Sequence, residues 1–117
     1  MITIYHNNRC SKSRDSLCIL QENTSNINII DYQKNPPSAT ELKALLAKLK
    51  MKPEELARKG EKLYKEQFAG KSFSDDEWLK ILSENPILIE RPIIVNGDKA
   101  VIGRPPEKVK QLLAHSR

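Results

Sequence analysis

Hydrophobic and polar positions near the N-terminus follow the pattern of a strand, a helix and a second strand. Residues 2–6, ITIYH, are mostly β-branched or aromatic, and the polar residues after them predict a turn. A helix is expected to begin near Cys10 or Ser11 and to end at about Gln21, before a run of turn-forming residues. Residues 27–32, INIIDY, form the second predicted strand. A helical crossover joins strands that run in the same direction, so the two strands are predicted to be parallel.

The middle of the chain has the period of amphipathic helices instead. Leucines recur at helical spacing between residues 42 and 49, after a capping-box pair formed by Ser38 and Glu41. Residues 53–60 begin with proline and end with glycine, which predicts a short helix that ends just after Arg58.

Another capping box, Ser74 with Glu77, opens a helix that the Asn-Pro pair at 85–86 is expected to end. Beyond residue 86 the spacing of the apolar residues changes from that of a helix to that of strands. The apolar residues 93–95 and 100–102 flank an Asn-Gly pair, which supplies the positive φ that a tight hairpin needs, so a hairpin is predicted. A final helix follows a proline-rich break, with three residues facing inward: Val109, Leu112 and Leu113.

This order of elements, β-α-β, then helices, then β-β-α, is the order of the thioredoxin-like fold. The sequence therefore predicts an α/β protein with a mixed sheet of about four strands. A helical segment is inserted at about residues 38–84 between the two halves of that fold. A length of 117 residues suits a single domain over residues 1–117.

Composition narrows the partners that the chain is expected to have. It carries 20 Lys and Arg against 15 Asp and Glu, a net charge of +5, and the basic residues are scattered rather than gathered in one block. Anionic partners suit this balance, while a nucleic-acid-binding tail is not expected. The N-terminus lacks a signal-peptide pattern and no apolar run is long enough to span a membrane, so we expect a soluble, cytoplasmic protein. No long exposed apolar stripe is evident, which favours a monomer, and we expect no metal site.

Cys10 is the candidate reactive residue. It lies where the first strand leads into a helix N-terminus, and there the unpaired backbone N–H groups and the positive end of the helix dipole favour thiolate over thiol. Nearby side chains add positive charge: Arg9, Lys12 and Arg14. His6, at the end of the first strand, is a candidate imidazolium partner of the sulfur.

A second thiol for an internal disulfide is missing. Ser13 stands where the second cysteine of a Cys-x-x-Cys motif would be; it either donates a hydrogen bond to the thiolate or is only a polar residue of the first turn. Cys18, in the middle of the helix, is expected to be a small buried hydrophobic residue. Eight residues of helix separate the two cysteines by about 12 Å, too far for a disulfide. A phosphatase-type Cys-x5-Arg loop is excluded, because position 16 is serine.

Four segments in chain order, IYHNNRCSKSRDSL, ELARKGEKLYKE, NPILIERPIIV and VIGRPPEKV, resemble the glutaredoxin-linked arsenate reductase family, the ArsC type. The resemblance covers almost the whole chain. It implies that Cys10 is the catalytic nucleophile, with His6 as its electrostatic helper and Ser13 as a hydrogen-bond donor to the thiolate. It also implies an oxyanion clamp of three arginines: Arg58, Arg91 and Arg104.

The resemblance implies the reduction of arsenate to arsenite, with glutathione as co-substrate, glutaredoxin as a further reductant and no tightly bound cofactor. In a thioredoxin-like fold the proline that opens the third strand is normally cis, so we predict a cis Arg91–Pro92 bond. The family usually has proline where this chain has Asn8, so the turn before Cys10 is expected to be less rigid.

Two other functions fit parts of the sequence. Regulators of the Spx type share the fold and bind RNA polymerase, but they commonly carry Cys-x-x-Cys and do not need the full arginine clamp. A monothiol glutaredoxin-like oxidoreductase also uses a lone cysteine. Its glutathione site normally includes Thr-Val-Pro and Gly-Gly, whereas this chain has ERPII and NGDK.

Overall fold

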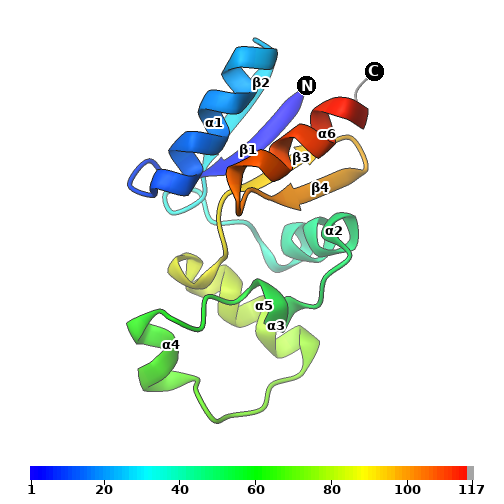
Figure 1. Cartoon of the computed structure of the whole chain (residues 1–117). Coiled ribbons are helices and arrows are strands. Elements are labelled where there is room, and N and C mark those ends of the chain that lie inside the picture. Colours follow the sequence, from blue (N-terminus) through cyan, green and yellow to red (C-terminus); the bar gives the residue numbers. More distant parts are fainter. Residues whose placement is uncertain (116–117) are drawn as a thin grey trace. The chain divides into compact units, whose positions relative to one another are not determined.

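The computed structural model describes residues 1–115, and its contacts divide the chain into two compact units. The first unit joins Met1–Asn35 to the segment from Arg91 onward, and the second unit is Pro36–Glu90. The organisation of the chain as a single domain over residues 1–117 stays a prediction. Figure 1 labels the elements of both units.

The first unit is built on a mixed sheet of four strands: β1 (Ile2–His6), β2 (Ile27–Asp31), β3 (Ile93–Asn96) and β4 (Lys99–Ile102). Their order in the sheet is β2-β1-β3-β4. β1 pairs with β2 in parallel and with β3 in antiparallel orientation, and β3 pairs with β4 in antiparallel orientation. The predicted strands, the parallel pair and the mixed α/β sheet are thereby confirmed.

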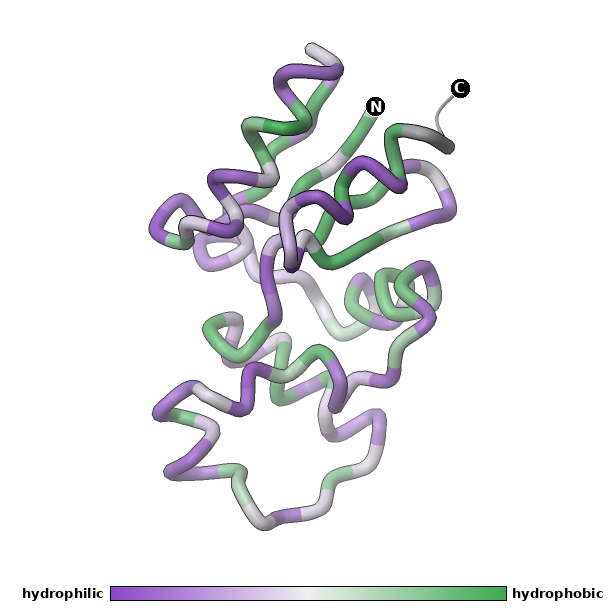
Figure 2. The backbone as a smooth tube through the Cα atoms, viewed as in Figure 1, coloured by the Kyte–Doolittle hydropathy of each residue, from purple (hydrophilic) through white to green (hydrophobic). Residues whose placement is uncertain are grey.

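Two helices cover one face of this sheet, α1 (Ser11–Asn23) and α6 (Val109–His115), the latter preceded by the short 3₁₀ helix η2 (Pro106–Lys108). Alternate residues of the central strands point into the core that these helices close. In Figure 2 the hydrophobic stretches of β1 and β3 lie among more hydrophilic loops. The buried core cluster consists of Ile2, Ile4, Leu20, Ile94, Val109 and Leu112, with Leu113 packed against it.

The predicted hairpin is confirmed, although its turn lies one residue further along than Asn-Gly. Asn96 pairs with Lys99, so the two turn residues are Gly97 and Asp98. Gly97 has a φ of 65°, a conformation that glycine adopts without steric cost.

The second unit is helical. Both helices predicted from capping boxes are present: the Ser38 hydroxyl accepts a hydrogen bond from the Glu41 N–H at 3.1 Å, and Ser74 and Glu77 cap each other. Trp78 is buried, and its ring stacks on Tyr64 with a centroid distance of 6.3 Å. The elements are α2 (Ala39–Leu49), α3 (Pro53–Leu56), α4 (Lys62–Gln67), α5 (Asp75–Glu84) and the 3₁₀ helix η1 (Pro86–Leu88).

The helix predicted to end just after Arg58 is shorter than expected. α3 ends at Leu56, and Ala57 forms an isolated antiparallel bridge with Ile89. The Arg58 N–H donates to the Leu88 carbonyl at 2.7 Å, so this backbone pairing replaces a further turn of helix. Gly60 is therefore not the cap of α3. α4 is a helix that the sequence reasoning did not predict.

None of the helices within residues 1–115 has both the length and the apolar character needed to cross a bilayer. Over the same residues, no three His, Cys, Asp or Glu side chains gather closely enough to hold a metal ion.

Gly103 lies at a close approach of three segments of the first unit. Its N–H donates to the Pro92 carbonyl at 2.9 Å, and its carbonyl accepts from the Ser16 hydroxyl at 3.4 Å. A Cβ atom at this position would overlap Ser16 Oγ and would lie 2.9 Å from Pro92 Cγ. The backbone of α1, the start of β3 and the end of β4 meet here because residue 103 has no side chain.

We therefore expect Gly103→Ala to lower the free energy of unfolding by about 1–3 kcal/mol, the usual cost of overpacking. Urea titration followed by circular dichroism measures the change. Gly60→Ala is the matched control, since a Cβ there meets nothing within 4 Å. Equal stability of the two variants would show that the contact around Gly103 relaxes without cost.

Candidate active site

Cys10 is the N-cap residue of α1, as its place in the sequence suggested. Its backbone is extended, with φ −98° and ψ 122°, and its carbonyl accepts from the Arg14 N–H at 3.0 Å. A turn holds the residue in place, because the Cys10 N–H donates to the Asn7 carbonyl at 3.0 Å. The side chain is partly exposed, so the sulfur lies at the helix N-terminus with access to solvent.

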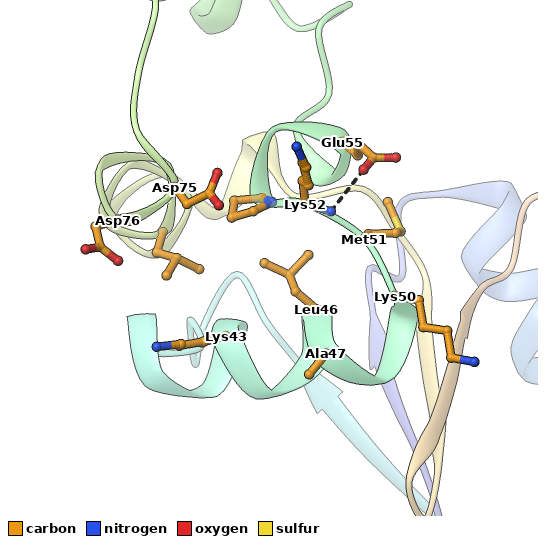
Figure 3. A pocket seen from close by; sticks show the side chains of 11 residues that line it. Lys43, Leu46, Ala47, Lys50, Met51, Lys52, Glu55, Asp75 and Asp76 are labelled. Carbon is orange, nitrogen blue, oxygen red and sulfur yellow. Dashed lines mark hydrogen bonds between the residues drawn. The ribbon is translucent and has the colours of Figure 1, made fainter.

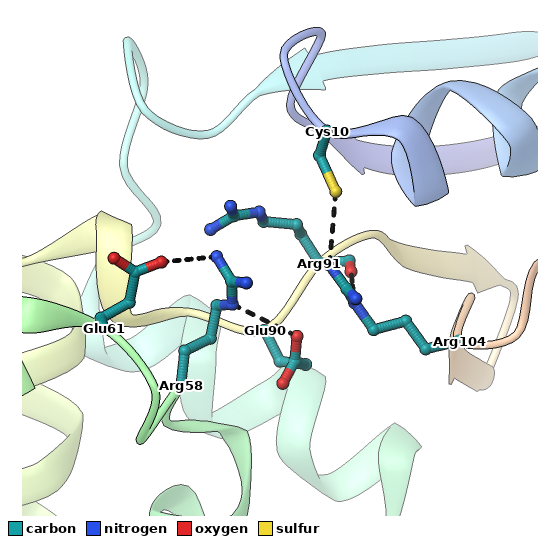
Figure 4. Close-up of polar contacts among 6 residues, drawn as sticks. All are labelled: Cys10, Arg58, Glu61, Glu90, Arg91 and Arg104. Atoms are coloured by element: carbon teal, nitrogen blue, oxygen red, sulfur yellow. Dashed lines mark hydrogen bonds and ion pairs between the residues drawn. The ribbon is translucent and has the colours of Figure 1, made fainter.

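Arg104 contacts the sulfur directly (Figure 4). Its Nη2 donates to Cys10 Sγ at 3.3 Å, and its Nε donates to the Arg91 carbonyl at 2.7 Å. The hydrogen bond to the Arg91 carbonyl fixes the Arg104 guanidinium near the start of β3. Both Arg91–Pro92, as predicted, and Arg104–Pro105 are cis peptide bonds. The structure thus brings two predicted clamp residues, Arg91 and Arg104, to Cys10.

The surroundings of Cys10 favour its thiolate. Partial burial raises the pKa of the thiol, but four influences lower it and prevail. In order of size they are the hydrogen bond from the Ser13 backbone N–H, the Arg91 side chain, the charge of Arg104 and the Lys12 backbone N–H. The net pKa of Cys10 is below its ordinary value. A helix N-terminus and two guanidinium groups together account for this shift.

His6 and Ser13, four residues before and three residues after Cys10, form a buried pair. His6 is 6% exposed and Ser13 is fully buried, with 2.7 Å between His6 Nδ1 and Ser13 Oγ. The Asn7 N–H donates to the same oxygen at 3.0 Å. A hydroxyl accepts two hydrogen bonds and donates one. If Nδ1 carries the proton, Ser13 accepts from both neighbours and its own proton is available to another acceptor; otherwise that proton goes to His6.

Cys18 is exposed, so the prediction that it is buried is wrong. The buried positions of α1 are Ser13, Ser16 and Leu20, at the three- and four-residue spacing of one helix face. Cys18 lies two residues from Ser16, about 200° around the helix from that face. Because two serines occupy the buried face, hydropathy alone pointed to the wrong side.

Arg58 belongs to the second unit. Its Nη1 lies 2.7 Å from Glu61 Oε1, and its Nε lies 3.5 Å from Glu90 Oε1. The sequence reasoning named neither glutamate. The predicted role of Arg58 toward Cys10 stays a prediction.

A cavity of about 650 Å³ lies within the second unit (Figure 3). Apolar side chains such as Leu46 and Leu79 line it together with charges of both signs, Lys43 and Lys52 on the one hand and Asp75 on the other. It contains none of the predicted site residues, and its mixed charge selects no single class of ligand. The candidate site is the surroundings of Cys10.

Comparison with known families identifies residues 5–112 as matching the ArsC family. The chain belongs to the ArsC family. It is 44% identical over 114 residues to the uncharacterized protein YfgD of Escherichia coli K12, and the match covers 96% of each chain. A Haemophilus influenzae protein named arsenate reductase is 40% identical over 114 residues, covering 96% of this chain and 98% of the relative. The solved arsenate reductase from Vibrio cholerae has a TM-score of 0.90 and 42% identity, covering 95% of this chain and 96% of that one.

Tyr32 is a buried residue of this ArsC family protein that the sequence reasoning did not assign to the site. It follows β2 directly and is 1% exposed. Burial raises the pKa of its phenol, and the positive charge of Arg91 opposes that shift. The signal was present in the strand pattern: His6 pairs with Asp31, so Tyr32 follows at the same sheet end that holds His6.

We predict that Arg104→Ala raises the pKa of Cys10, because the thiolate loses both a hydrogen bond and a neighbouring positive charge. The pH dependence of iodoacetamide alkylation measures this in a Cys18→Ser background, where Cys10 is the remaining cysteine. Arg14→Ala is the matched control: it removes the same charge from an arginine that donates instead to the Asn8 carbonyl at 3.1 Å. Equal shifts in the two variants would contradict a specific role of Arg104.

The ionisation of Cys10 should make the free energy of unfolding depend on pH. Since the pKa of Cys10 is lower in the folded chain, the unfolded chain binds more protons between the two pKa values. This stabilisation is complete above the unfolded-state pKa and is lost as the pH falls through the folded-state pKa. Cys10→Ala should remove that part of the pH dependence, and thermal unfolding across the pH range would reveal it.

Proposed function

We propose that this ArsC family protein reduces arsenate to arsenite, with Cys10 as the nucleophile and external thiols as the reductant. The observation that carries the proposal is the 3.3 Å contact between Arg104 Nη2 and Cys10 Sγ, on a thiol whose pKa is lowered. Such a sulfur is ionised more readily than a free thiol and already faces a cation that can receive an oxyanion.

The charge of the substrate explains the need for arginine. Arsenate is a tetrahedral anion, so the approach of a thiolate brings negative charge to negative charge. Guanidinium groups keep their positive charge at working pH and bind oxyanion oxygens in pairs. We assign Arg91 and Arg104 to this role because both side chains act on Cys10. Arg58 is the third proposed member of the clamp, on the strength of the family resemblance.

The proposed cycle begins when the Cys10 thiolate attacks arsenate. A sulfur–arsenic bond forms, and one arsenate oxygen leaves as water after protonation. Glutathione then attacks the arsenic(V) adduct, and a second oxygen leaves in the same way. A glutaredoxin thiolate attacks the glutathione sulfur and breaks the bond between that sulfur and arsenic. The electron pair of this bond stays on arsenic and reduces it from arsenic(V) to arsenic(III). Hydrolysis releases arsenite and the Cys10 thiol, while a glutathione–glutaredoxin disulfide carries the two oxidised sulfurs.

The electrons must come from outside the chain because Cys18 is unsuited to supply them. Cys18 is exposed and lies eight residues along α1 from the N-cap position of Cys10, about 12 Å in a helix. A disulfide requires Cα atoms within about 7 Å. The cycle therefore uses glutathione and glutaredoxin, and a reducing cytoplasm suits it. We propose that the protein works as a monomer.

His6 and Ser13 are proposed to serve the thiolate state of Cys10. With His6 Nδ1 protonated, Ser13 Oγ accepts from His6 and from Asn7, and its hydroxyl proton can be directed to the sulfur. Ser13 also contributes its backbone N–H, which lowers the pKa of Cys10. In this arrangement the two side chains act as one hydrogen-bonded relay behind the nucleophile.

Arsenate-dependent oxidation of NADPH, coupled through glutathione, glutaredoxin and glutathione reductase, tests the proposal. Cys10→Ser should abolish turnover, because no other group forms the covalent adduct. Arg91→Ala and Arg104→Ala should each lower kcat/KM by on the order of 10²- to 10³-fold, the usual effect of losing one donor to a developing oxyanion. Cys18→Ser is the control and should keep wild-type activity. Turnover that persists in Cys10→Ser would refute the mechanism.

The form in which glutathione becomes attached to Cys10 separates this function from that of a monothiol glutaredoxin-like oxidoreductase. Mass spectrometry of the protein with glutathione should show glutathione joined to Cys10 through arsenic when arsenate is added and no adduct without it, because in the proposed cycle glutathione attacks the arsenic(V) adduct. Modification by glutathione disulfide at the same rate with and without arsenate, together with no arsenate turnover, would favour the oxidoreductase. Capture of RNA polymerase without thiol-dependent turnover would favour an Spx-type regulator.

A further inference from the structure

Arg58 is held by two carboxylates rather than presented as a bare cation (Figure 4). Glu61 Oε1 lies 2.7 Å from Nη1, and Glu90 Oε1 lies 3.5 Å from Nε. All three side chains are only 22–27% exposed, so water screens these charges less than it screens a surface ion pair. Glu61 is three residues beyond Arg58 in the chain, whereas Glu90 comes from a distant segment.

Backbone pairing holds Arg58 and Glu90 on a common face. Ala57 and Ile89 form an antiparallel bridge, flanked by the hydrogen bonds Arg58 N–H to Leu88 O at 2.7 Å and Glu90 N–H to Leu56 O at 2.9 Å. Residues on either side of a bridged pair point to the opposite face from that pair. Arg58 and Glu90 are therefore diagonal neighbours on one face, a separation that long side chains span.

Each glutamate contacts one of the two nitrogen pairs through which the Arg58 guanidinium could bind an oxyanion. A guanidinium binds an oxyanion through two parallel N–H groups, either from Nε with Nη2 or from Nη1 with Nη2. Glu90 contacts Nε of the first pair and Glu61 contacts Nη1 of the second. An oxyanion that binds Arg58 through either pair therefore meets a nitrogen that already contacts a carboxylate, and it competes with that carboxylate.

We propose that Glu61 and Glu90 are affinity-determining residues that compete with a tetrahedral oxyanion for Arg58. This inference rests on the proposed function, in which Arg58 binds the substrate oxyanion. The carboxylates are tethered to the same unit as Arg58, so they compete at a high effective concentration. A ligand that binds must offer at least two oxygens and enough negative charge to replace a carboxylate. The glutamates thus weaken the binding of anions to Arg58 while they keep its side chain in place.

Removal of either charge should strengthen oxyanion binding. Sulfate is the probe, because it is a tetrahedral dianion that does not react with Cys10, and isothermal titration calorimetry at fixed ionic strength measures its Kd. We expect Glu61→Gln and Glu90→Gln each to lower the Kd by roughly three- to tenfold, the range of a partly buried ion pair. The KM for arsenate in the coupled assay should fall in parallel. Glutamine is nearly isosteric with glutamate, and circular dichroism checks that each variant folds.

Two controls separate this effect from a general change of charge. Glu54→Gln also removes one negative charge, from a glutamate that pairs instead with Lys59 at 3.2 Å, and it should leave the Kd unchanged. In an Arg58→Ala background the glutamine substitutions should no longer strengthen binding. An unchanged or weaker sulfate affinity in Glu61→Gln and Glu90→Gln would overturn the inference. A gain that equals that of Glu54→Gln, or that persists without Arg58, would also overturn it.

The sulfate-binding experiment tests the inference about the glutamates, and the turnover experiment separately tests the proposed function. If sulfate binding tightens as expected but arsenate is not turned over, the competition for Arg58 stands and arsenate reduction is refuted. If arsenate is turned over but the glutamine variants do not bind sulfate more tightly, the inference about the glutamates is wrong and the proposed function remains.

Discussion

The hydrogen bonds of Arg104 organise the site around Cys10. Its Nη2 donates to the sulfur at 3.3 Å while its Nε donates to the Arg91 carbonyl at 2.7 Å. A neutral carbonyl fixes the direction of the guanidinium without countering its charge. The residue before it, Gly103, permits the close backbone contact with Pro92 that brings β4 and β3 to this point. The pKa of Cys10 is lowered by the Ser13 N–H and the Arg91 side chain and, after these, by the charge of Arg104.

Arg104 and Arg58 differ in the charge of the groups that they contact. Arg104 bonds a carbonyl and a sulfur, whereas Arg58 contacts two carboxylates. An arginine next to a thiolate stabilises a charge that belongs to the protein, while an arginine paired with glutamates exchanges one anion for another. Two arginines in the same protein can therefore have different roles. The carboxylates near each guanidinium decide how readily it accepts a further anion.

Local signals predicted most of the fold, and non-local contacts account for what was missed. Capping boxes at Ser38 and Ser74 located α2 and α5, and strand composition located the sheet. The early end of α3 could not be predicted, because it results from backbone pairing with a segment over 30 residues away. Cys18 was placed on the wrong face because two buried serines break the hydropathy pattern of α1. For the site, the helix N-terminus predicted an activated Cys10, whereas the Arg104 contact, between residues 94 positions apart, was anticipated only through family resemblance.

The packing of Ser16 against Gly103 restricts which side chain position 16 can carry. Ser16 is fully buried, and its hydroxyl donates to the Gly103 carbonyl at 3.4 Å. Residue 16 is the sixth after Cys10, the position from which a Cys-x5-Arg loop would supply its own guanidinium. An arginine there would have to displace the backbone at Gly103, so the observed packing does not accommodate one. In the proposed function the cations come from segments remote in the sequence, so anion binding would depend on the completed tertiary structure rather than on a local motif.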